Sequence, residues 1–365
     1  MRTSDPGFVP PFCPRFKCRH HRDPTGWKFE GHGVFERKAR PRIIRRFRCL
    51  SCRHAFSTQS FDTTYYLKRP DVQRPIHQAL VACAGMRQAG RSLGIAGSSV
   101  QRQASRLGRH CLLFQRLHGP KSAPNEELEL DGLMSFEYSQ YWPFEVNVLV
   151  GSNSHFFYGF TESDLRRSGR MTAAQKAKRE SLEAKFGRPD PLATRRAVEA
   201  LISMVAPGGG TLTVHSDEHQ AYPLAFRKLP HAIRHATVSS RRNRSCANPL
   251  FRVDLLDLLL RHSGSNHKRE TIAFSKRRQG ALERVAVFQT WRNFIKRTRE
   301  RDTDGPSPAQ TIGIQARRLD LDDLLHRRIF PTRVRLPSGL AAVYWRRVPT
   351  RQIQPGTTHR LRLAA

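Results

Sequence analysis

The stretch "GTLTVHSDEHQAY", residues 210–222, joins a short apolar alternation to an acidic residue. Leu212 and Val214 alternate with polar residues, which predicts a β-strand, and Asp217 stands where the alternation stops. Asp217 has two possible roles: it caps the helix that "SDEHQAY" predicts, or it is half of a metal site. The two roles are compatible, so the question for the rest of the chain is whether it predicts a metal site as well.

Charge restricts the class of partner. The 365 residues include 64 Lys and Arg against 30 Asp and Glu, which gives a formal charge of +34 and a pI near 11.3. Such a chain needs a polyanion, and nucleic acid is the usual one because binding releases counterions from the phosphates; a membrane surface is the weaker alternative. With no apolar run long enough for a signal peptide or for a membrane helix of ~20 residues, we expect a cytoplasmic protein.

Four of the seven cysteines form two close pairs near the N-terminus: Cys13, Cys18, Cys49 and Cys52. Two such pairs, each on a tight turn, predict a structural Zn²⁺ site in a zinc ribbon over residues 1–62. The first pair is spaced by four residues instead of two, so His20 or His21 is a possible substitute ligand. Four reduced cysteines without metal are the alternative. The other three cysteines, Cys83, Cys111 and Cys246, are expected to be ordinary buried thiols.

A helix-turn-helix is predicted within residues 63–120. Apolar residues at helical spacing from Ile76 to Cys83, a turn near Gly94 and a helix from Gly97 or Ser98 give this layout, whose last helix enters the major groove of DNA. The residues expected to contact DNA here are Arg87, Arg91, Ser98, Ser99, Gln101, Arg102 and Arg106. A plain helical hairpin between two domains is the alternative.

Three consecutive β-type runs follow, over residues 128–138, 143–151 and 155–162, and short turns predict an antiparallel meander. Two helical stretches, 173–187 and 194–206, then lead to the strand that precedes Asp217. This order of elements is that of a ribonuclease H-like fold, in which the first and fourth strands are neighbours. We therefore expect Asp131 and Asp217 to lie close together in a catalytic domain over residues 121–300.

Neighbouring carboxylates repel each other, and a divalent cation relieves that repulsion. Mg²⁺, or Mn²⁺, suits phosphoryl transfer when two ions lie about 4 Å apart over the scissile phosphate. A later helix, "NPLFRVDLLDLLLRH" (248–262), is apolar except for a stripe that holds Asp254, Asp257 and Arg261. Asp257 facing solvent in an i,i+4 pair with Arg261 is the alternative. Glu270 is a further candidate for the third acid.

Four segments, "LELDGLMSF", "HSDEHQAY", "NPLFRVDLLDLLLRH" and "NHKRETIAFSKRRQGALERVAVFQTWRNFIK", together resemble the bacterial insertion-sequence transposases of the DDE type. Those proteins carry an N-terminal zinc ribbon and helix-turn-helix, and the likeness runs from Cys13 to Lys296. It implies a catalytic domain whose acids bind two Mg²⁺ ions, with Asp131 as the first acid and Asp217 as the second. The family usually closes its triad with Glu. Here the segment is similar to an Asn-x-x-Asp form of the helix, which favours Asp257.

Basic residues beside this helix are expected to hold the DNA backbone: Lys268, Arg269, Lys276, Arg277 and Arg278. A solvated basic face is the alternative. The prediction is a transposase that binds terminal inverted repeats and target DNA, acts as a homo-oligomer of at least two chains and associates with the nucleoid. An inactive DNA-binding regulator and a nuclease of the same fold are the competing functions. Residues 301–365 are expected to be a weakly patterned basic extension.

Overall fold

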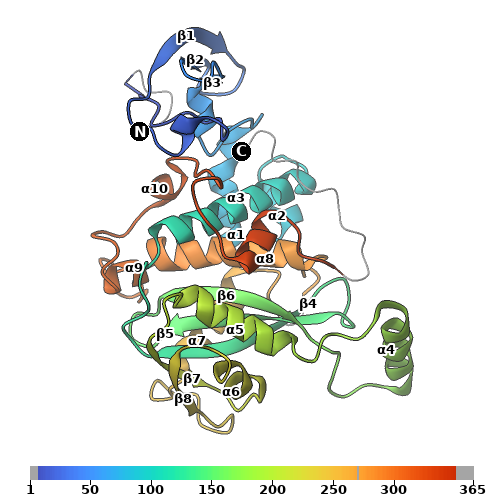
Figure 1. The fold of residues 1–365 in the computed structure, drawn as a ribbon. Coiled ribbons are helices and arrows are strands. Elements are labelled where there is room, and N and C mark those ends of the chain that lie inside the picture. The colour runs from blue at the N-terminus through green and yellow to red at the C-terminus, as the bar shows by residue number, and fades with distance from the viewer. Residues whose placement is uncertain (1–6, 269–270, 351–365) are drawn as a thin grey trace.

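The computed structural model describes residues 7–268 and 271–350. A small N-terminal sheet lies at one end of the molecule, long helices cross the middle, and a five-stranded mixed sheet lies at the other end (Figure 1). No helix within these two ranges is long and apolar enough to cross a lipid bilayer. The predicted mixture of α and β structure is confirmed.

The N-terminal module, residues 7–61, is an antiparallel sheet in the order β1-β2-β3. Its elements are η1 (Arg19–His21), β1 (Phe29–Glu36), β2 (Ile43–Cys49), β3 (Ala55–Ser57) and η2 (Thr58–Phe61). Aromatic rings fill its core: Phe47 and Phe56 stack with 5.7 Å between ring centroids, beside buried Cys13, Cys18 and Cys49. So few apolar side chains give a small core, which is the situation in which a structural metal contributes most to folding.

The helical layer begins with η3 (Pro70–Val72), α1 (Gln73–Val81), α2 (Met86–Ser92) and α3 (Gly97–His118). Gly94, with a φ of +61°, makes the predicted turn between α2 and α3. The long helix α3 packs against α8 (Arg278–Thr290), where a Cβ on Gly108 would lie 2.4 Å from the carbonyl oxygen of Glu283. Ser105 Oγ also donates to Glu283 Oε1 at 2.7 Å. Helices α1, α2 and α3 therefore share one core with the later helices.

The five-stranded sheet has the order β6-β5-β4-β7-β8. Its strands are β4 (Leu128–Phe136), β5 (Pro143–Gly151), β6 (Phe157–Asp164), β7 (Thr211–Ser216) and β8 (Ala232–Thr237). β4 pairs antiparallel with β5 along its whole length and parallel with β7 over Leu128–Leu130 only. The predicted adjacency of the first and fourth strands is confirmed, although the first strand ends at Phe136 instead of residue 138 and the third is shifted to 157–164.

Helices cover both faces of the sheet. Leu128 and Leu130 pack with α5 (Ala193–Val205) and α6 (Ala221–Phe226), while Leu133 joins the core made with α3, α7 (Phe251–Ser263) and α8. Side chains alternate between the two faces of a strand, so Asp131 lies on the face of Leu133, toward α7. The alternation of side chains therefore places the carboxylate of Asp131 between β4 and α7.

Helix α4 (Ala173–Phe186) stands away from the body of the protein (Figure 1), and none of its residues is buried. Its start is capped by Thr172, whose Oγ1 accepts from the backbone N–H of Gln175. At its other end Phe186 meets Trp142 edge to face, with 5.5 Å between ring centroids. The ring contact and the pairing of Glu183 with Arg166 hold a charged helix that contributes little to the core.

The C-terminal segment, residues 291–350, holds η4 (Trp291–Ile295), α9 (Pro308–Thr311), α10 (Leu321–Leu325) and α11 (Ser338–Tyr344). The sequence pattern after residue 300 is weak, yet Leu324, Val343 and Tyr344 are buried against α3 and α8 in the main core. Phe330 is buried among the aromatic rings of the N-terminal module. The segment therefore packs against both the main core and the N-terminal module.

Candidate active site and cysteine cluster

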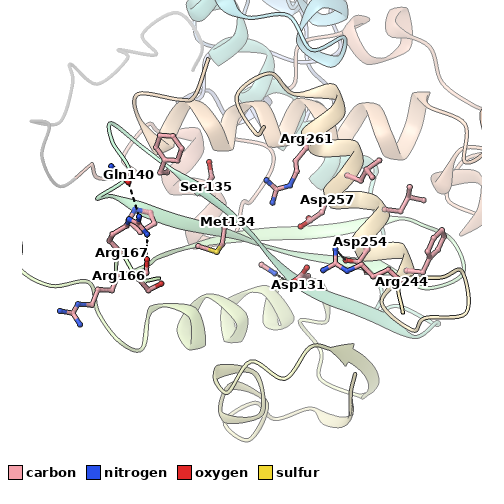
Figure 2. Close-up of a pocket in the computed structure, with 17 residues that line it drawn as sticks. Asp131, Met134, Ser135, Gln140, Arg166, Arg167, Arg244, Asp254, Asp257 and Arg261 are labelled. Carbon is pink, nitrogen blue, oxygen red and sulfur yellow. Dashed lines mark hydrogen bonds and ion pairs between the residues drawn. The ribbon is translucent and has the colours of Figure 1, made fainter. Parts of the chain in front are cut away.

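Three carboxylates meet at a cavity of about 920 Å³ between β4 and α7. Asp131 comes from the middle of β4, and Asp254 and Asp257 come from one side of α7, one turn apart (Figure 2). Asp257 points into this cavity and not into bulk solvent, which disfavours the solvent-facing role. Two structural elements distant in sequence thus bring these acids to one cavity.

Asp217 follows the last residue of β7 and lies near the same acids without lining the cavity. Its Oδ1 accepts from the backbone N–H of His219 at 3.0 Å. Helix α6 begins at Ala221 with Gln220 as its N-cap, so Asp217 does not cap that helix. The carboxylate instead shapes the turn that leaves the strand, with its charge felt by Asp131.

The charges of these acids oppose one another. Burial raises the pKa of Asp131 to about 6, and the charges of Asp217, Asp254 and Glu145 also raise it, against a hydrogen bond from the backbone of Gly132. Burial and the charge of Asp131 raise the pKa of Asp257 to about 8. Bringing these groups together therefore costs free energy that a bound cation would offset.

Asp257 also has an unsatisfied atom. Its Oδ1 is inaccessible to solvent and has no hydrogen-bond partner among the described residues. Burying such an atom is unfavourable unless something pairs with it, and oxygen atoms of this kind are the ligands that Mg²⁺ takes. The chemistry of the acids suits a divalent cation, but they do not form a closed ligand cage. Within residues 7–268 and 271–350, the only group of three or more His, Cys, Asp or Glu residues close enough together to hold a metal ion is that of the four cysteines.

A buried glutamate that the sequence analysis missed fixes α7 against the sheet. Glu129 Oε2 accepts from the backbone N–H groups of Arg252 and Val253, at 2.8 and 2.9 Å, in the first turn of α7. Burial raises the pKa of Glu129 to about 7 despite these hydrogen bonds. Glu129 lies two residues before Asp131 on the same face of β4, so it couples the positions of Asp131 and Asp257. An acid at an inward position of "LELD" is the signal that could have revealed it.

Several arginines line the cavity, and the sequence analysis singled out only Arg261 among them. Arg166 and Arg167 lie at one end and Arg244 at the other, with Arg261 on α7 between them (Figure 2). Arg244 Nη1 lies 3.8 Å from Asp254 Oδ1, and Arg166 pairs with Glu183 of α4. Cations on both sides of a set of acids suit a substrate that carries several phosphates.

The basic residues expected beside α7 divide into two groups. Lys268 and Lys276 are exposed, and Arg277 is half-buried. Arg278 is 4% exposed, and its guanidinium pairs with Glu137, Glu162 and Asp164. The predicted contact of Arg278 with DNA is therefore wrong, because three carboxylates already surround this cation in the interior. Arg269 and Glu270 lie outside the described residues.

The residues of α2 and α3 that were expected to contact DNA also fall into exposed and partly buried groups. Arg87 and Arg91 on α2 are exposed, as are Ser98 and Arg102 at the start of α3. Ser99 and Gln101 are half-buried, and Gln101 lies near Gly280 of α8. Arg106 Nε donates to the carbonyl oxygen of Thr63 at 2.9 Å, and burial lowers the pKa of Arg106 to about 10. The expectation that Arg106 reads DNA is therefore corrected: it ties α3 to the preceding segment.

The four N-terminal cysteines converge. Sγ of Cys13 lies 3.6 Å from Sγ of Cys52, Sγ of Cys18 lies 4.0 Å from that of Cys49, and all four lie within 4.8 Å of one another. Although burial opposes it, hydrogen bonds from the backbone of Cys52, from the Trp27 indole and from the backbone of Ser51 lower the pKa of Cys49 to about 7. Four thiols at this spacing fit a tetrahedral Zn²⁺ site.

The histidines beside this cluster have other partners. His21 Nδ1 donates to the carbonyl oxygen of Cys13 at 2.8 Å, and His21 Nε2 lies 2.6 Å from Thr332 Oγ1. His20 Nδ1 lies 3.3 Å from the carbonyl oxygen of Asp23. Of the remaining cysteines, Cys111 is buried and Cys83 half-buried, but Cys246 is exposed, contrary to expectation.

Comparison with known proteins gives little. No protein-family model matches the chain, and no curated protein matches it. Among solved structures, it is similar to a cryo-electron microscopy structure of a simian T-cell lymphotropic virus intasome in complex with PP2A regulatory subunit B56 gamma. That similarity has 16% identity and a TM-score of 0.25, and it covers 66% of this chain and 74% of the other.

Proposed function

We propose that the protein is a DNA transposase that cleaves DNA strands and joins them to target DNA by metal-assisted phosphoryl transfer. The observation that carries the proposal is the cavity lined by both Asp131 and Asp257, where the charge of Asp217 acts on Asp131 and a buried oxygen of Asp257 lacks a hydrogen-bond partner among the described residues. The formal charge of +34 and the strand order β6-β5-β4-β7-β8, which is that expected of a ribonuclease H-like catalytic domain, support it.

In this proposal Asp131, Asp217 and Asp257 hold Mg²⁺ or Mn²⁺, with Asp254 as the alternative third ligand. The metal would supply activation of the attacking oxygen and stabilisation of the leaving one. Glu129 holds α7 in register with β4 and so keeps the acids at a fixed separation. Arg244 and the arginines at the opposite end of the cavity bind phosphates on either side of the scissile bond.

Recognition of the element ends falls to other parts of the chain. The cysteine cluster holds a structural Zn²⁺ in residues 1–62, and residues 63–120 bind DNA through the exposed Arg87, Arg91, Ser98 and Arg102. Exposed Lys268 and Lys276, with Arg277, add backbone contacts beside the catalytic domain of residues 121–300. Two ends have to be joined, so the working form is a homo-oligomer of at least two chains.

A DNA-binding regulator without catalytic activity is the second candidate. It is favoured by one observation: among the described residues, the acids form no cluster as tight as that of the cysteines. Such a protein would keep the fold and the basic surfaces. It would bind element ends and leave their strands intact.

The deciding experiment incubates the purified protein with Mg²⁺ or Mn²⁺ and DNA that carries the sequences flanking its own gene. Asp131→Ala, Asp217→Ala and Asp257→Ala are compared with Asp304→Ala, which removes an exposed aspartate outside the cavity. A transposase cleaves and joins strands, loses both activities in the first three variants and keeps them in the fourth. Cleavage without joined products indicates a nuclease, and binding without cleavage indicates the regulator.

A further inference from the structure

The loop between β1 and β2 carries cations that no acid neutralises. Residues 37–46 contain six Lys and Arg and no Asp or Glu. Four of these six cations are exposed and form no ion pair with the part of the chain that the structure describes: Lys38, Arg40, Arg42 and Arg46. So many like charges in one short segment repel one another, and a polyanion would relieve that repulsion.

Arg37 holds this loop in one shape. Its Nε and Nη2 donate to the carbonyl oxygens of Pro41 and Arg40, at 2.9 and 2.8 Å, and its Nη1 donates to Gln59 Oε1 at 2.7 Å. Its backbone N–H donates to the carbonyl oxygen of Arg42 at 2.8 Å. Gln59 is buried in η2, so these bonds join the loop to the body of the N-terminal module. A loop held in this way loses little conformational freedom when it binds a partner.

Exposure alternates along residues 38–42. Lys38, Arg40 and Arg42 are exposed, whereas Ala39 and Pro41 between them are half-buried. Three cations therefore lie on the outside of a loop whose intervening side chains are small. Figure 1 shows β1 and β2 at the end of the molecule opposite to the five-stranded sheet, so this loop lies away from the catalytic cavity.

The strand that precedes the loop favours one groove of DNA over the other. β1 contains Glu30 and Glu36 and no Lys or Arg. The major groove, about 12 Å wide, accepts a two-stranded ribbon, but this ribbon would bring both glutamates toward the phosphates. The minor groove is about 6 Å wide, and in A·T-rich DNA its strong negative potential attracts inserted Arg and Lys. Only the loop has the charge and the small side chains that this groove requires.

We propose that residues 38–42 enter the minor groove of duplex DNA, with Lys38, Arg40 and Arg42 against the phosphates and the A·T base edges. Arg37 is a positioning residue, because its side chain is bonded to the loop and to Gln59. The inference rests on duplex DNA being the partner in the proposed function. It adds a contact separate from the catalytic cavity and from α2 and α3, and with it a preference for A·T-rich DNA.

The test compares two duplexes of equal length, one with a run of A·T pairs at its centre and the other with G·C pairs there. Binding of the full chain is measured by fluorescence anisotropy without added Mg²⁺, so that no strand is cut. The A·T duplex should bind about 10-fold more tightly. Netropsin, which occupies the minor groove, should remove this preference, and methyl green, which occupies the major groove, should leave it.

The triple variant Lys38→Ala/Arg40→Ala/Arg42→Ala should bind both duplexes equally. Its affinity should also fall less steeply with salt, because each lost phosphate contact lowers the slope of log K against log salt concentration by about 0.9. The three side chains are exposed, so their truncation leaves the core of the N-terminal module intact. Circular dichroism and zinc content should match those of the unmodified protein.

Lys178→Ala/Arg227→Ala/Lys228→Ala is the matched control, because it removes the same charge at exposed positions outside the loop. It should keep the preference for the A·T duplex. Arg37→Lys keeps the charge of residue 37 but cannot make all three bonds of the guanidinium. It should lose most of the preference and keep the salt dependence.

The outcomes separate the inference from the proposed function. If the unmodified protein binds both duplexes equally, or the triple loop variant keeps the preference, the minor-groove contact is refuted while DNA binding stands. Competition by methyl green and not by netropsin assigns the loop to the major groove and overturns the inference. So does competition by anionic phospholipid vesicles as strong as that by the A·T duplex. Binding of neither duplex refutes the proposed function and the inference with it.

Discussion

Removing the charge of Asp257 should make the metal-free protein more stable. The pKa of this group is raised from 3.8 to about 8, with burial as the largest cause and the charge of Asp131 second. At pH 7 the carboxyl is ionised in the unfolded chain but largely protonated in the folded one. Between pH 3.8, the pKa in the unfolded chain, and pH 7, the folded protein loses about 1.4 kcal/mol of stability per pH unit. The loss at pH 7 is therefore about 4 kcal/mol. Local relaxation of the protein and entry of water reduce this loss, so we expect Asp257→Asn to increase the free energy of unfolding by about 1–3 kcal/mol.

The sign of the pH dependence follows from the raised pKa. A carboxyl whose folded-state pKa is raised contributes its full stability below about pH 4 and loses it as the pH rises toward about 8. Asn does not titrate. The difference between Asp257→Asn and the unmodified protein should therefore be small near pH 4 and should widen from pH 5 to pH 8.

Urea denaturation at several pH values, without added Mg²⁺, measures this difference. Asp304→Asn is the control, because it removes the charge of an exposed aspartate and should change stability little at any pH. Added Mg²⁺ should stabilise the unmodified protein more than Asp257→Asn, since the variant lacks one anionic ligand. A variant that is less stable than the unmodified protein at pH 8, or a difference that stays constant between pH 5 and pH 8, refutes the reasoning.

Three further changes test other contacts. Gly108→Ala should destabilise the protein by about 1–3 kcal/mol in urea denaturation, because its Cβ would overlap the backbone of Glu283; unchanged stability would contradict the close packing of α3 on α8. Glu129→Gln should cost about 1 kcal/mol and slow strand cleavage with DNA affinity retained, since it weakens the hold on the first turn of α7; an unchanged cleavage rate argues against a positioning role. Cys49→Ser should lower the zinc content measured by elemental analysis and weaken binding to element ends, and retention of both would sink the zinc assignment.

The sequence was sufficient for features that depend on local pattern. Alternation located the strands that carry Asp131 and precede Asp217, and helical spacing put Asp254 and Asp257 on one side of α7. The convergence of the four cysteines followed from their spacing in two pairs. In each case neighbours in sequence determine which way a side chain points.

Features that depend on contacts between residues far apart in the sequence could not be predicted. In the sequence, Arg278 is one more cation in a basic run. Only folding surrounds it with three carboxylates, which come from β6 and from the turn between β4 and β5. Arg244 lies in a segment with no periodic pattern, so nothing in the sequence places it at the cavity. Phe330 is a single aromatic residue in a weakly patterned segment, and its burial depends on rings more than 250 residues earlier.

The burial of Phe330 in the N-terminal module bears on the order in which the chain can mature. Residues 7–61 leave the ribosome long before Phe330 and Thr332 are synthesised. During that time the aromatic core of the N-terminal module lacks the ring of Phe330, and His21 lacks the hydroxyl of Thr332. The four cysteines are synthesised early, but the final packing of the module has to follow synthesis of Phe330 and Thr332. A fragment cut after residue 62 would expose this aromatic surface, and fragments meant for study of the module alone should carry residues 326–334 in cis or as an added peptide.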